Sequence, residues 1–379
     1  MKIEQIKWEE TDGWNVTNSE PILSDANLVL AFGGRTVLEN KERFNEIKLF
    51  YPNSNILCCS TSGEIMDTQV HDNTIVVTAI HFEHTELRVS STEVYSLESS
   101  YATGKSIADS FPKEELLHLF VISDGQKVNG SELVRGMNDG LPVNVTVTGG
   151  LAGDGSRFQK TLVGLNNYPA EGKIVAVGFY GKNLIVNYGS IGGWDSFGPD
   201  RLITKSKNNI LYELDGQSAL ELYKKYLGDQ AVGLPGTALL FPLSIKLSDG
   251  EQPVVRTILS IDEENKSMIF AGDMPEGSYA RLMKANFERL IEGASSAATN
   301  TIESDKGVSP ELAILLSCVG RKLVLGQRIE EEVEGVREVL GDRTILSGFY
   351  SYGEISPFNT AAKCELHNQT MTITTFTER

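Results

Sequence analysis

One pattern recurs along this 379-residue chain: a β-rich run ends in small residues, a glycine and an acid. It occurs at residues 55–64, 144–154 and 344–354, and each time the acid directly follows the glycine (Glu64, Asp154 and Glu354). Small residues at the end of a strand let the backbone approach a ligand, and glycine tolerates positive φ. We therefore interpret the three copies as walls of one kind of binding site.

Each copy closes a strand–helix–strand unit, at about residues 28–65, 116–154 and 312–354. Such units imply parallel strand pairs with right-handed crossovers, and ligands bind beyond the carboxyl ends of strands in sheets of this kind. Between the units the sequence predicts hairpins, including residues 74–90 and 173–188. Hairpins make the sheets mixed, so we predict an α+β fold of two related halves that face each other across a cleft.

The length favours two domains, because a single core of this size is unusual. Residues 191–207 are rich in Gly, Ser, Asp and Lys, which predicts a boundary between domains 1–200 and 201–379. In the second domain, the apolar spacing of residues 278–298 predicts a helix. Residues 366–376 predict a closing, Thr-rich strand at the edge of a sheet.

Composition excludes several classes of protein. A formal net charge of −17 argues against a nucleic-acid partner, since phosphate binding requires clustered Lys and Arg. No run of eighteen apolar residues and no signal peptide are visible, so we expect no membrane span. The four cysteines form no C-x-x-C pair, and reduced thiols in a cytoplasm are the simplest explanation.

Six blocks of sequence, spread over nearly the whole chain, resemble the FIST (F-box and intracellular signal transduction) sensory domain with its N- and C-terminal halves. They are CSTSGEI at 59–65, GGLAGD at 149–154, VVR at 254–256, AGDMPEG at 271–277, CVGR at 318–321 and GFYSYGEI at 348–355. The resemblance implies a cytoplasmic small-ligand sensor of bacterial signalling, with a partner such as a histidine kinase or chemotaxis transducer. No output domain follows Arg379, so we expect a stand-alone sensor that acts on a separate protein.

The resemblance also implies the ligand class, because amino acids have been proposed as ligands of the family. The chemistry of the sequence agrees with a small anionic or zwitterionic molecule. Arg256 follows two valines and Arg321 follows a buried strand, positions where a charge is costly without a partner. A guanidinium matches a carboxylate, and one of the acids could hold the ammonium. The alternative is that each arginine pairs with Glu64, Asp154 or Glu354, and that the acids cap turns.

The predicted ligand-binding residues combine these arginines and acids with the neighbouring hydroxyl groups and one glycine. They are Ser60, Thr61, Glu64, Gly153, Asp154, Arg256, Arg321, Tyr350, Ser351, Tyr352 and Glu354. We predict no metal ligands and no catalytic residues among them.

Two alternative functions remain open. Some relatives of the FIST type are haem proteins that sense nitric oxide and regulate a histidine kinase, and His367 shares a strand face with apolar residues, as haem ligation requires. A second alternative is an enzyme that uses Cys318 or Glu354. A nucleophile needs a positioned base, and no assembled catalytic motif is visible, so we expect no enzyme activity and no cofactor other than the haem alternative.

Overall fold

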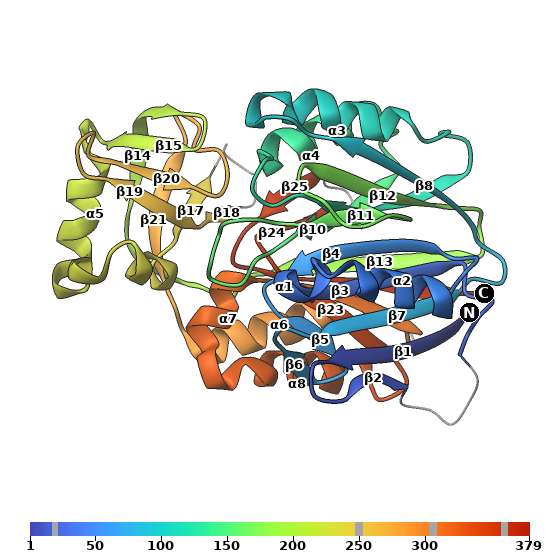
Figure 1. Cartoon of the computed structure of the whole chain (residues 1–379). Coiled ribbons are helices and arrows are strands. Elements are labelled where there is room, and N and C mark those ends of the chain that lie inside the picture. The colour runs from blue at the N-terminus through green and yellow to red at the C-terminus, as the bar shows by residue number, and fades with distance from the viewer. Residues whose placement is uncertain (17–21, 247–252, 303–308, 358–362) are drawn as a thin grey trace.

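The computed structural model describes residues 1–16, 22–246, 253–302, 309–357 and 363–379. Three six-stranded mixed sheets form the main body, and an eight-stranded sheet forms a smaller lobe beside it (Figure 1). Helices cover the outer faces of the three sheets. The predicted α+β class with mixed sheets is confirmed.

A parallel strand pair lies inside each sheet of the main body, as the three strand–helix–strand units predict. The pairs are β3 (Leu28–Gly34) with β4 (Asn55–Thr61), β9 (Leu116–Ser123) with β10 (Thr146–Leu151), and β22 (Leu312–Cys318) with β23 (Ile345–Ser351). The crossovers contain α2 (Lys41–Phe50), α4 (Gly130–Gly140) and α8 (Ile329–Leu340). Asn40 and Asn129 begin α2 and α4 as N-caps that accept from the backbone N–H two or three residues on.

An antiparallel strand flanks the first strand of each pair, and a further strand lies outside it. The inner flanking strands are β7 (Ile75–His81), β12 (Lys173–Tyr180) and β26 (Met371–Glu378), and the outer ones are β1 (Lys2–Glu9), β8 (Glu86–Glu93) and β13 (Leu184–Ile191). The hairpins predicted at 74–90 and 173–188 are therefore wrong. β7 is already paired on both edges, by β1 and β3, and β12 by β8 and β9, so the chain leaves for another sheet at each break.

Each sheet is completed by a strand from another unit. After the first bend, β5 (Glu64–Met66) joins β23; after the second, β11 (Val163–Leu165) joins β4; after the third, β24 (Gly353–Pro357) joins β10. The exchange is cyclic, so no unit can close its sheet alone. The N- and C-terminal halves of the sequence are interlocked by these strands.

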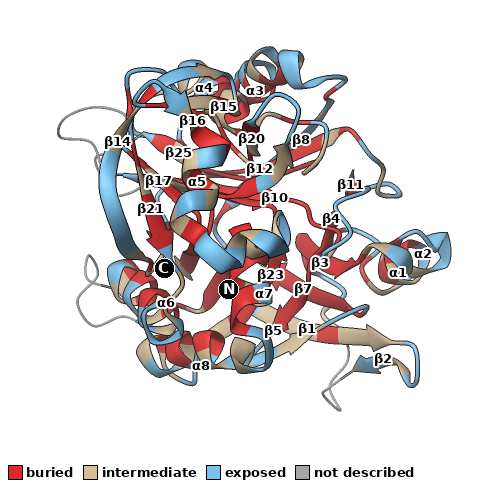
Figure 2. Ribbon diagram, turned by 90° about the vertical axis from the view of Figure 1, so that its left-hand side faces the viewer, coloured by how far each residue is buried: buried red, intermediate tan, exposed pale blue. Residues whose placement is uncertain are grey.

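The three sheets face one another across a shared apolar core. Phe32, Phe120 and Phe349 lie in it, and the rings of Phe32 and Phe349 have centroids 4.8 Å apart. Figure 2 shows the buried strands at the centre and exposed helix faces outside. Each fully buried apolar side chain of this size contributes about 1.5–3 kcal/mol relative to exposure, so the core holds the three sheets together.

The smaller lobe begins where a linker was expected. Most of residues 191–207 belong to the long strand β14 (Asp195–Lys207), which enters the eight-stranded sheet and spans the predicted boundary at 200. The other elements of the lobe are β15 (Ile210–Leu214), β16 (Gln217–Ser218), α5 (Ala219–Leu227), β17 (Leu243–Lys246), β18 (Val254–Arg256), β19 (Ile258–Asp262), β20 (Ser267–Phe270) and β21 (Tyr279–Lys284).

Two further expectations need correction. The predicted helix 278–298 begins as β21, because residues 279–284 place alternate side chains in the core of the lobe, and α6 (Phe287–Ile302) follows. The predicted edge strand at 366–376 is divided between β25 (Cys364–His367) and β26. The latter lies inside a sheet, between β13 and β22.

The remaining elements lie at the periphery of the main body. They are β2 (Gly13–Val16), α1 (Arg35–Leu38), β6 (Gln69–His71), α3 (Ser100–Asp109) and α7 (Val319–Leu325). The helix α7 follows β22 directly and lies beside the ends of the parallel strands.

Close approach of parallel strands requires glycine at two equivalent positions. A Cβ on Gly348 would lie 1.9 Å from the carbonyl oxygen of Leu315, and one on Gly149 would lie 1.8 Å from that of Val121.

We expect Gly348→Ala to lower the free energy of unfolding by about 3 kcal/mol, measured by urea denaturation, because the backbone must move to admit the methyl group. Gly236→Ala is the control, since its Cβ meets no atom within 4 Å. Equal stability of the two variants would contradict the packing described.

Candidate functional site

The three glycine–acid bends meet and bond to one another through their backbones. Ser62 N–H donates to the Tyr350 carbonyl at 2.8 Å, and Tyr350 N–H donates to Gly63 at 2.8 Å, which joins the first and third bends. Tyr352 N–H donates to the Leu151 carbonyl at 3.2 Å and joins the third bend to the second. The ring is closed by Gly153, whose N–H donates to the Ser60 carbonyl at 2.8 Å and whose carbonyl accepts from Ser60 Oγ at 2.7 Å.

The acids of the first and third bends are buried and held in the same way. Glu64 accepts from the hydroxyl of Thr61 and, at 2.8 Å, from that of Thr74. Glu354 accepts from Ser351 Oγ at 2.5 Å and from Thr370 Oγ1 at 2.9 Å. Burial raises the pKa of Glu64 to about 7 and that of Glu354 to about 8, against the effect of these hydrogen bonds. Both carboxyl groups therefore titrate near neutral pH.

The acid of the second bend, Asp154, is kept in its ionised form by ion pairs with two arginines. Asp154 accepts from Arg35 Nε at 2.7 Å and from Arg157 Nη2 at 2.6 Å, and also from the backbone N–H groups of residues 159 and 160. Burial opposes ionisation, but the hydrogen bonds from Arg157 and Arg35 lower the pKa of Asp154. This copy of the pattern therefore holds a fixed negative charge and shapes the loop that follows.

A polar cavity of about 240 Å³ opens at the first bend. Its lining residues include Thr61, Glu64, Asp72, Arg157 and Lys322. It contains both signs of charge together with the hydroxyl groups of the bend. Such a cavity can bind a small molecule that carries a carboxylate and an ammonium.

Lys322 is fixed over the first bend by α7. Its Nζ donates to the Ser62 carbonyl at 2.9 Å, forms an ion pair with Asp72, and lies 5.6 Å from the ring centroid of Tyr350. A Cβ on Gly63 would lie 2.4 Å from this Nζ, so the glycine of the pattern makes room for the lysine. Lys322 is one of the two cations of the cavity, with Arg157.

Arg321, the residue before it, points into the core. Its guanidinium is fully buried and donates to Glu332 Oε2 from Nε at 3.0 Å and Nη2 at 2.6 Å, and to the carbonyl of Leu290 at 2.7 Å. Glu332 also accepts from the Tyr350 hydroxyl at 2.7 Å and from Ser317 Oγ at 3.0 Å. The predicted ligand residues Arg321 and Tyr350 thus belong to a buried network that docks α7 and α8 onto β23.

Arg256 lies apart from the bends, on β18 of the smaller lobe. It is buried and donates to the backbone carbonyls of Leu366 at 2.9 Å and Asp273 at 3.4 Å. Burial lowers its pKa to about 10. Its contacts connect the smaller lobe to β25 of the main body, which is a structural role.

Tyr352 lines a second, larger cavity of about 580 Å³, whose other walls come from the main body and the smaller lobe. The other predicted residues, which line neither of these two cavities, lie in the bends: Ser60, Gly153, Asp154, Ser351 and Glu354.

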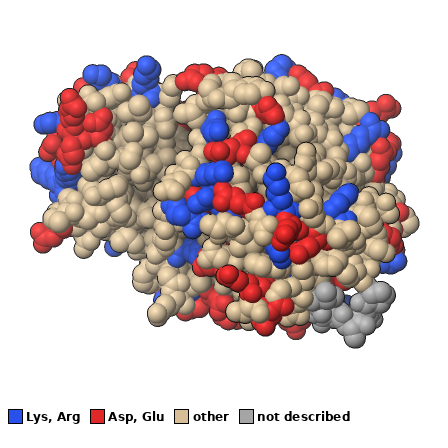
Figure 3. Space-filling view, viewed as in Figure 1, with Lys and Arg blue, Asp and Glu red and all other residues tan. Residues whose placement is uncertain are grey.

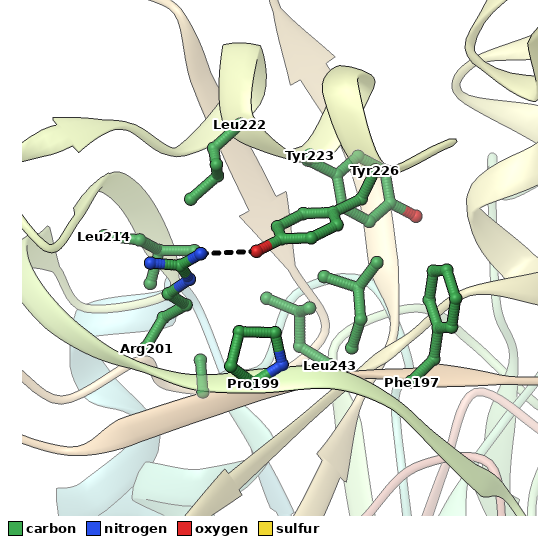
Figure 4. Close-up of a pocket in the computed structure, with 10 residues that line it drawn as sticks. Phe197, Pro199, Arg201, Leu214, Leu222, Tyr223, Tyr226 and Leu243 are labelled. Carbon is green, nitrogen blue, oxygen red and sulfur yellow. Dashed lines mark hydrogen bonds between the residues drawn. The ribbon is translucent and has the colours of Figure 1, made fainter. Parts of the chain in front are cut away.

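A third cavity, inside the smaller lobe, measures only about 10 Å³ (Figure 4). Arg201 donates there to the Tyr226 hydroxyl at 2.5 Å, and the space suffices for about one water molecule. The open cleft between two halves stays a prediction.

The haem alternative does not fit the surroundings of His367. The ring is 2% exposed, its Nε2 lies 2.8 Å from the Ser356 carbonyl, and none of the three cavities described here is lined by it. Burial lowers its pKa to about 4. Within the described parts of the chain, no three His, Cys, Asp or Glu residues are arranged to hold a metal ion.

The thiol of Cys318 is buried and uncharged, which does not favour a nucleophilic role. It is 2% exposed, and burial raises its pKa to about 12, so it is protonated at neutral pH. A thiolate is the reactive species in nucleophilic catalysis.

The distribution of charged side chains on the surface agrees with the negative net charge of the sequence. Figure 3 shows positive and negative side chains interspersed on the face in view, with no extended basic surface. Among the helices that the structure describes, none has the length and apolar character needed to cross a bilayer.

Two cationic residues that line the polar cavity were missed in the sequence. Arg157 stands three residues after Asp154, in the loop that the glycine–acid pattern begins, and Lys322 follows Arg321. Successive residues of a helix are rotated by about 100°, so Arg321 and Lys322 must face different ways. Which of the two is buried depends on Glu332 of α8, and the sequence gives no signal of that pairing. The partner Asp72 gave no signal, because no motif contains it.

Comparison with known proteins divides the chain into two matched domains. Residues 27–217 match the FIST N domain and residues 219–357 match the FIST C domain. An uncharacterized protein of Methanocaldococcus jannaschii is 23% identical over 362 residues, an alignment that covers 83% of this chain and 66% of that protein. The chain thus spans about two thirds of the length of this relative.

Among solved structures, cyanuric acid hydrolase from A. caulinodans aligns over 100% of this chain and 98% of its own, with a TM-score of 0.37 and 6% sequence identity. A likeness at this level supports no argument about function.

The two buried carboxyl groups predict a pH-dependent stability. Their pKa values in the folded protein, about 7 for Glu64 and 8 for Glu354, lie above the ordinary value of 4.5, so folding takes up protons. Their stabilisation is complete below pH 4.5 and is lost as the pH rises through 7 and 8. We expect the melting temperature to fall between pH 5 and pH 9, and Glu354→Gln, which stays uncharged, to reduce that fall.

The matched control is Glu10→Gln, which removes the same charge from an exposed position. Melting curves at several pH values would show the wild-type slope for this control. If Glu354→Gln has that same slope, Glu354 does not titrate in the folded protein as described.

Proposed function

This chain belongs to the FIST family, whose domains are sensors of signal transduction, and we propose that it binds an amino-acid-like zwitterion in the polar cavity at the first bend. The observation that supports this proposal most is the cavity itself. In about 240 Å³ it combines two cations, Lys322 and Arg157, with two carboxyl groups, Glu64 and Asp72.

The ligand carboxylate would be recognised by the cations. Lys322 already donates to one carbonyl and pairs with Asp72, whose side chain is 64% exposed, so a ligand carboxylate can take the place of a weak surface partner. Arg157 is 38% exposed and lines the same space. A charged hydrogen bond of this kind contributes roughly 1.5–3 kcal/mol, enough to select a carboxylate.

The ligand ammonium would be recognised by Glu64. At neutral pH this buried group is near its pKa of about 7, and a neighbouring positive charge favours its ionised form. Binding of an ammonium would therefore release a proton, and affinity would rise with pH through this range. The hydroxyl of Thr61, which donates to Glu64, orients the carboxylate from inside the bend.

Signalling would start from the elements that the ligand touches. Lys322 lies on α7, and the residues 155–157 belong to the loop after the second bend, so one ligand contacts both. Replacing Asp72 at Lys322 changes the contact between α7 and the loop before β7. We propose that a separate cytoplasmic signalling protein, such as a histidine kinase or a chemotaxis transducer, responds to that change.

Recognition rather than turnover is the proposed activity. The buried Cys318 thiol has a pKa of about 12, and the Glu354 carboxyl is enclosed by Ser351 and Thr370. Neither group lines the polar cavity.

A thermal-shift screen of the proteinogenic amino acids tests the proposal. We expect at least one to raise the melting temperature, and Lys322→Met to weaken its binding by at least about 10-fold in calorimetry, as the loss of a charged hydrogen bond predicts.

Lys224→Met serves as the control, because Lys224 pairs with Glu263 on the surface of the smaller lobe and does not line the polar cavity. The proposal fails if no amino acid stabilises the protein. It also fails if Lys322→Met retains the affinity of the wild type.

A further inference from the structure

The larger cavity, about 580 Å³, lies between the carboxyl ends of the main-body strands and the smaller lobe. We propose that it is a second binding site, for a neutral small molecule with an aromatic body, which adjoins the polar cavity at the first bend and shares Ser156 and Leu323 with it. Small-molecule sites are usually concave, mostly apolar and of roughly 300–1,000 Å³, and this cavity has that size and character.

Exposed apolar side chains gather around this cavity. Among the described residues, twelve large apolar side chains are exposed, and four of them line this one space: Leu97, Phe158, Leu259 and Leu323. They come from segments far apart in the sequence, so no single surface helix or strand accounts for their exposure. Apolar side chains grouped in this way mark a place where a partner removes them from water.

An aromatic surface forms one wall. The rings of Phe158 and Tyr352 are stacked, with centroids 4.5 Å apart and planes at 14°. Tyr352 Oη also accepts from the Phe158 N–H at 3.1 Å and donates to the Gly155 carbonyl at 3.0 Å. A ring on a fixed wall favours a ligand that is itself flat and aromatic.

The backbone of Phe158 is held in an unusual conformation. Its φ is +51°, a left-handed conformation that a bulky residue seldom adopts. The loop is held in place by the hydrogen bond that Phe158 N–H donates to Tyr352 Oη, and by those that the backbone N–H groups of residues 159 and 160 donate to Asp154. The second bend thus supports the aromatic wall.

The polar groups of the cavity are neutral. Gln126, Asn129, Ser156 and Asn209 line it, and no Lys, Arg, Asp, Glu or His is among its described lining residues. A charged ligand would lose its hydration without an opposite charge to replace it. The cavity therefore selects an uncharged molecule with one or two hydrogen-bonding groups.

Binding here would act on both bodies of the protein. Gln126 and Phe158 belong to the main body, whereas Leu259 and Phe270 belong to the smaller lobe. Asn129 Nδ2 donates to Asp273 Oδ1 at 3.0 Å beside the cavity and already joins the two bodies. A ligand that contacts both walls stabilises this docked arrangement by mass action.

Fluorescence titration of the full chain with N-phenyl-1-naphthylamine, a neutral aromatic amine that emits strongly only in apolar surroundings, tests the proposal. We expect saturable binding of one molecule per chain. Leu259→Trp fills the cavity from the lobe and Phe158→Ala removes the stacked wall, so each is expected to weaken binding by at least about 10-fold.

Two controls make the result specific. Leu49→Trp introduces the same residue at a position of α2 that is 79% exposed and does not line the cavity, and it should keep the affinity of the wild type. The anionic analogue 1-anilinonaphthalene-8-sulfonate should bind at least about 10-fold more weakly, because no lining cation offsets its charge. Non-saturable binding, equal affinity in all variants, or tighter binding of the sulfonate would overturn the proposal. Melting curves of both test variants verify that they are folded.

Discussion

The backbone hydrogen bonds among the three bends form a ring that ties the three sheets of the main body together. Each bend turns the chain out of its own sheet and into another, so β5, β11 and β24 complete sheets that they did not begin. A buried backbone N–H or carbonyl must find a partner, and at the bends the partners are other bends. Small residues and glycine are needed there because three backbones come together in one place.

The three bends share a design and differ in charge. Glu64 and Glu354 are enclosed by hydroxyl groups and titrate near neutral pH, whereas Asp154 is ionised by Arg35 and Arg157. The first bend faces the polar cavity, the second supports the loop that carries Phe158, and the third keeps its acid inside. The same glycine–acid bend thus lines a cavity in its first copy, supports a loop in its second and buries its acid in its third.

Local patterns in the sequence predicted the parallel pairs and their helices, because apolar runs and helical spacing are local signals. They also indicated Thr61 and Glu64, which line the polar cavity. They could not show that β7 and β8 belong to different sheets, since that depends on which edges are already paired. Nor could they separate Arg321 from Lys322: the buried partner Glu332 comes from α8, eleven residues on. The larger cavity gave no signal, because its apolar lining residues have the composition of an ordinary core.

Hydrogen exchange of individual amides, followed by NMR, tests whether the three bends form one closed ring. We expect the N–H groups of Ser62, Gly153, Tyr350 and Tyr352 to exchange only when the whole protein unfolds, because opening one bend breaks bonds to the other two. Exchange of these amides at the rates of peripheral strands such as β2 and β6 would show that the bends open independently. That result would contradict the ring as the element that holds the three sheets in register.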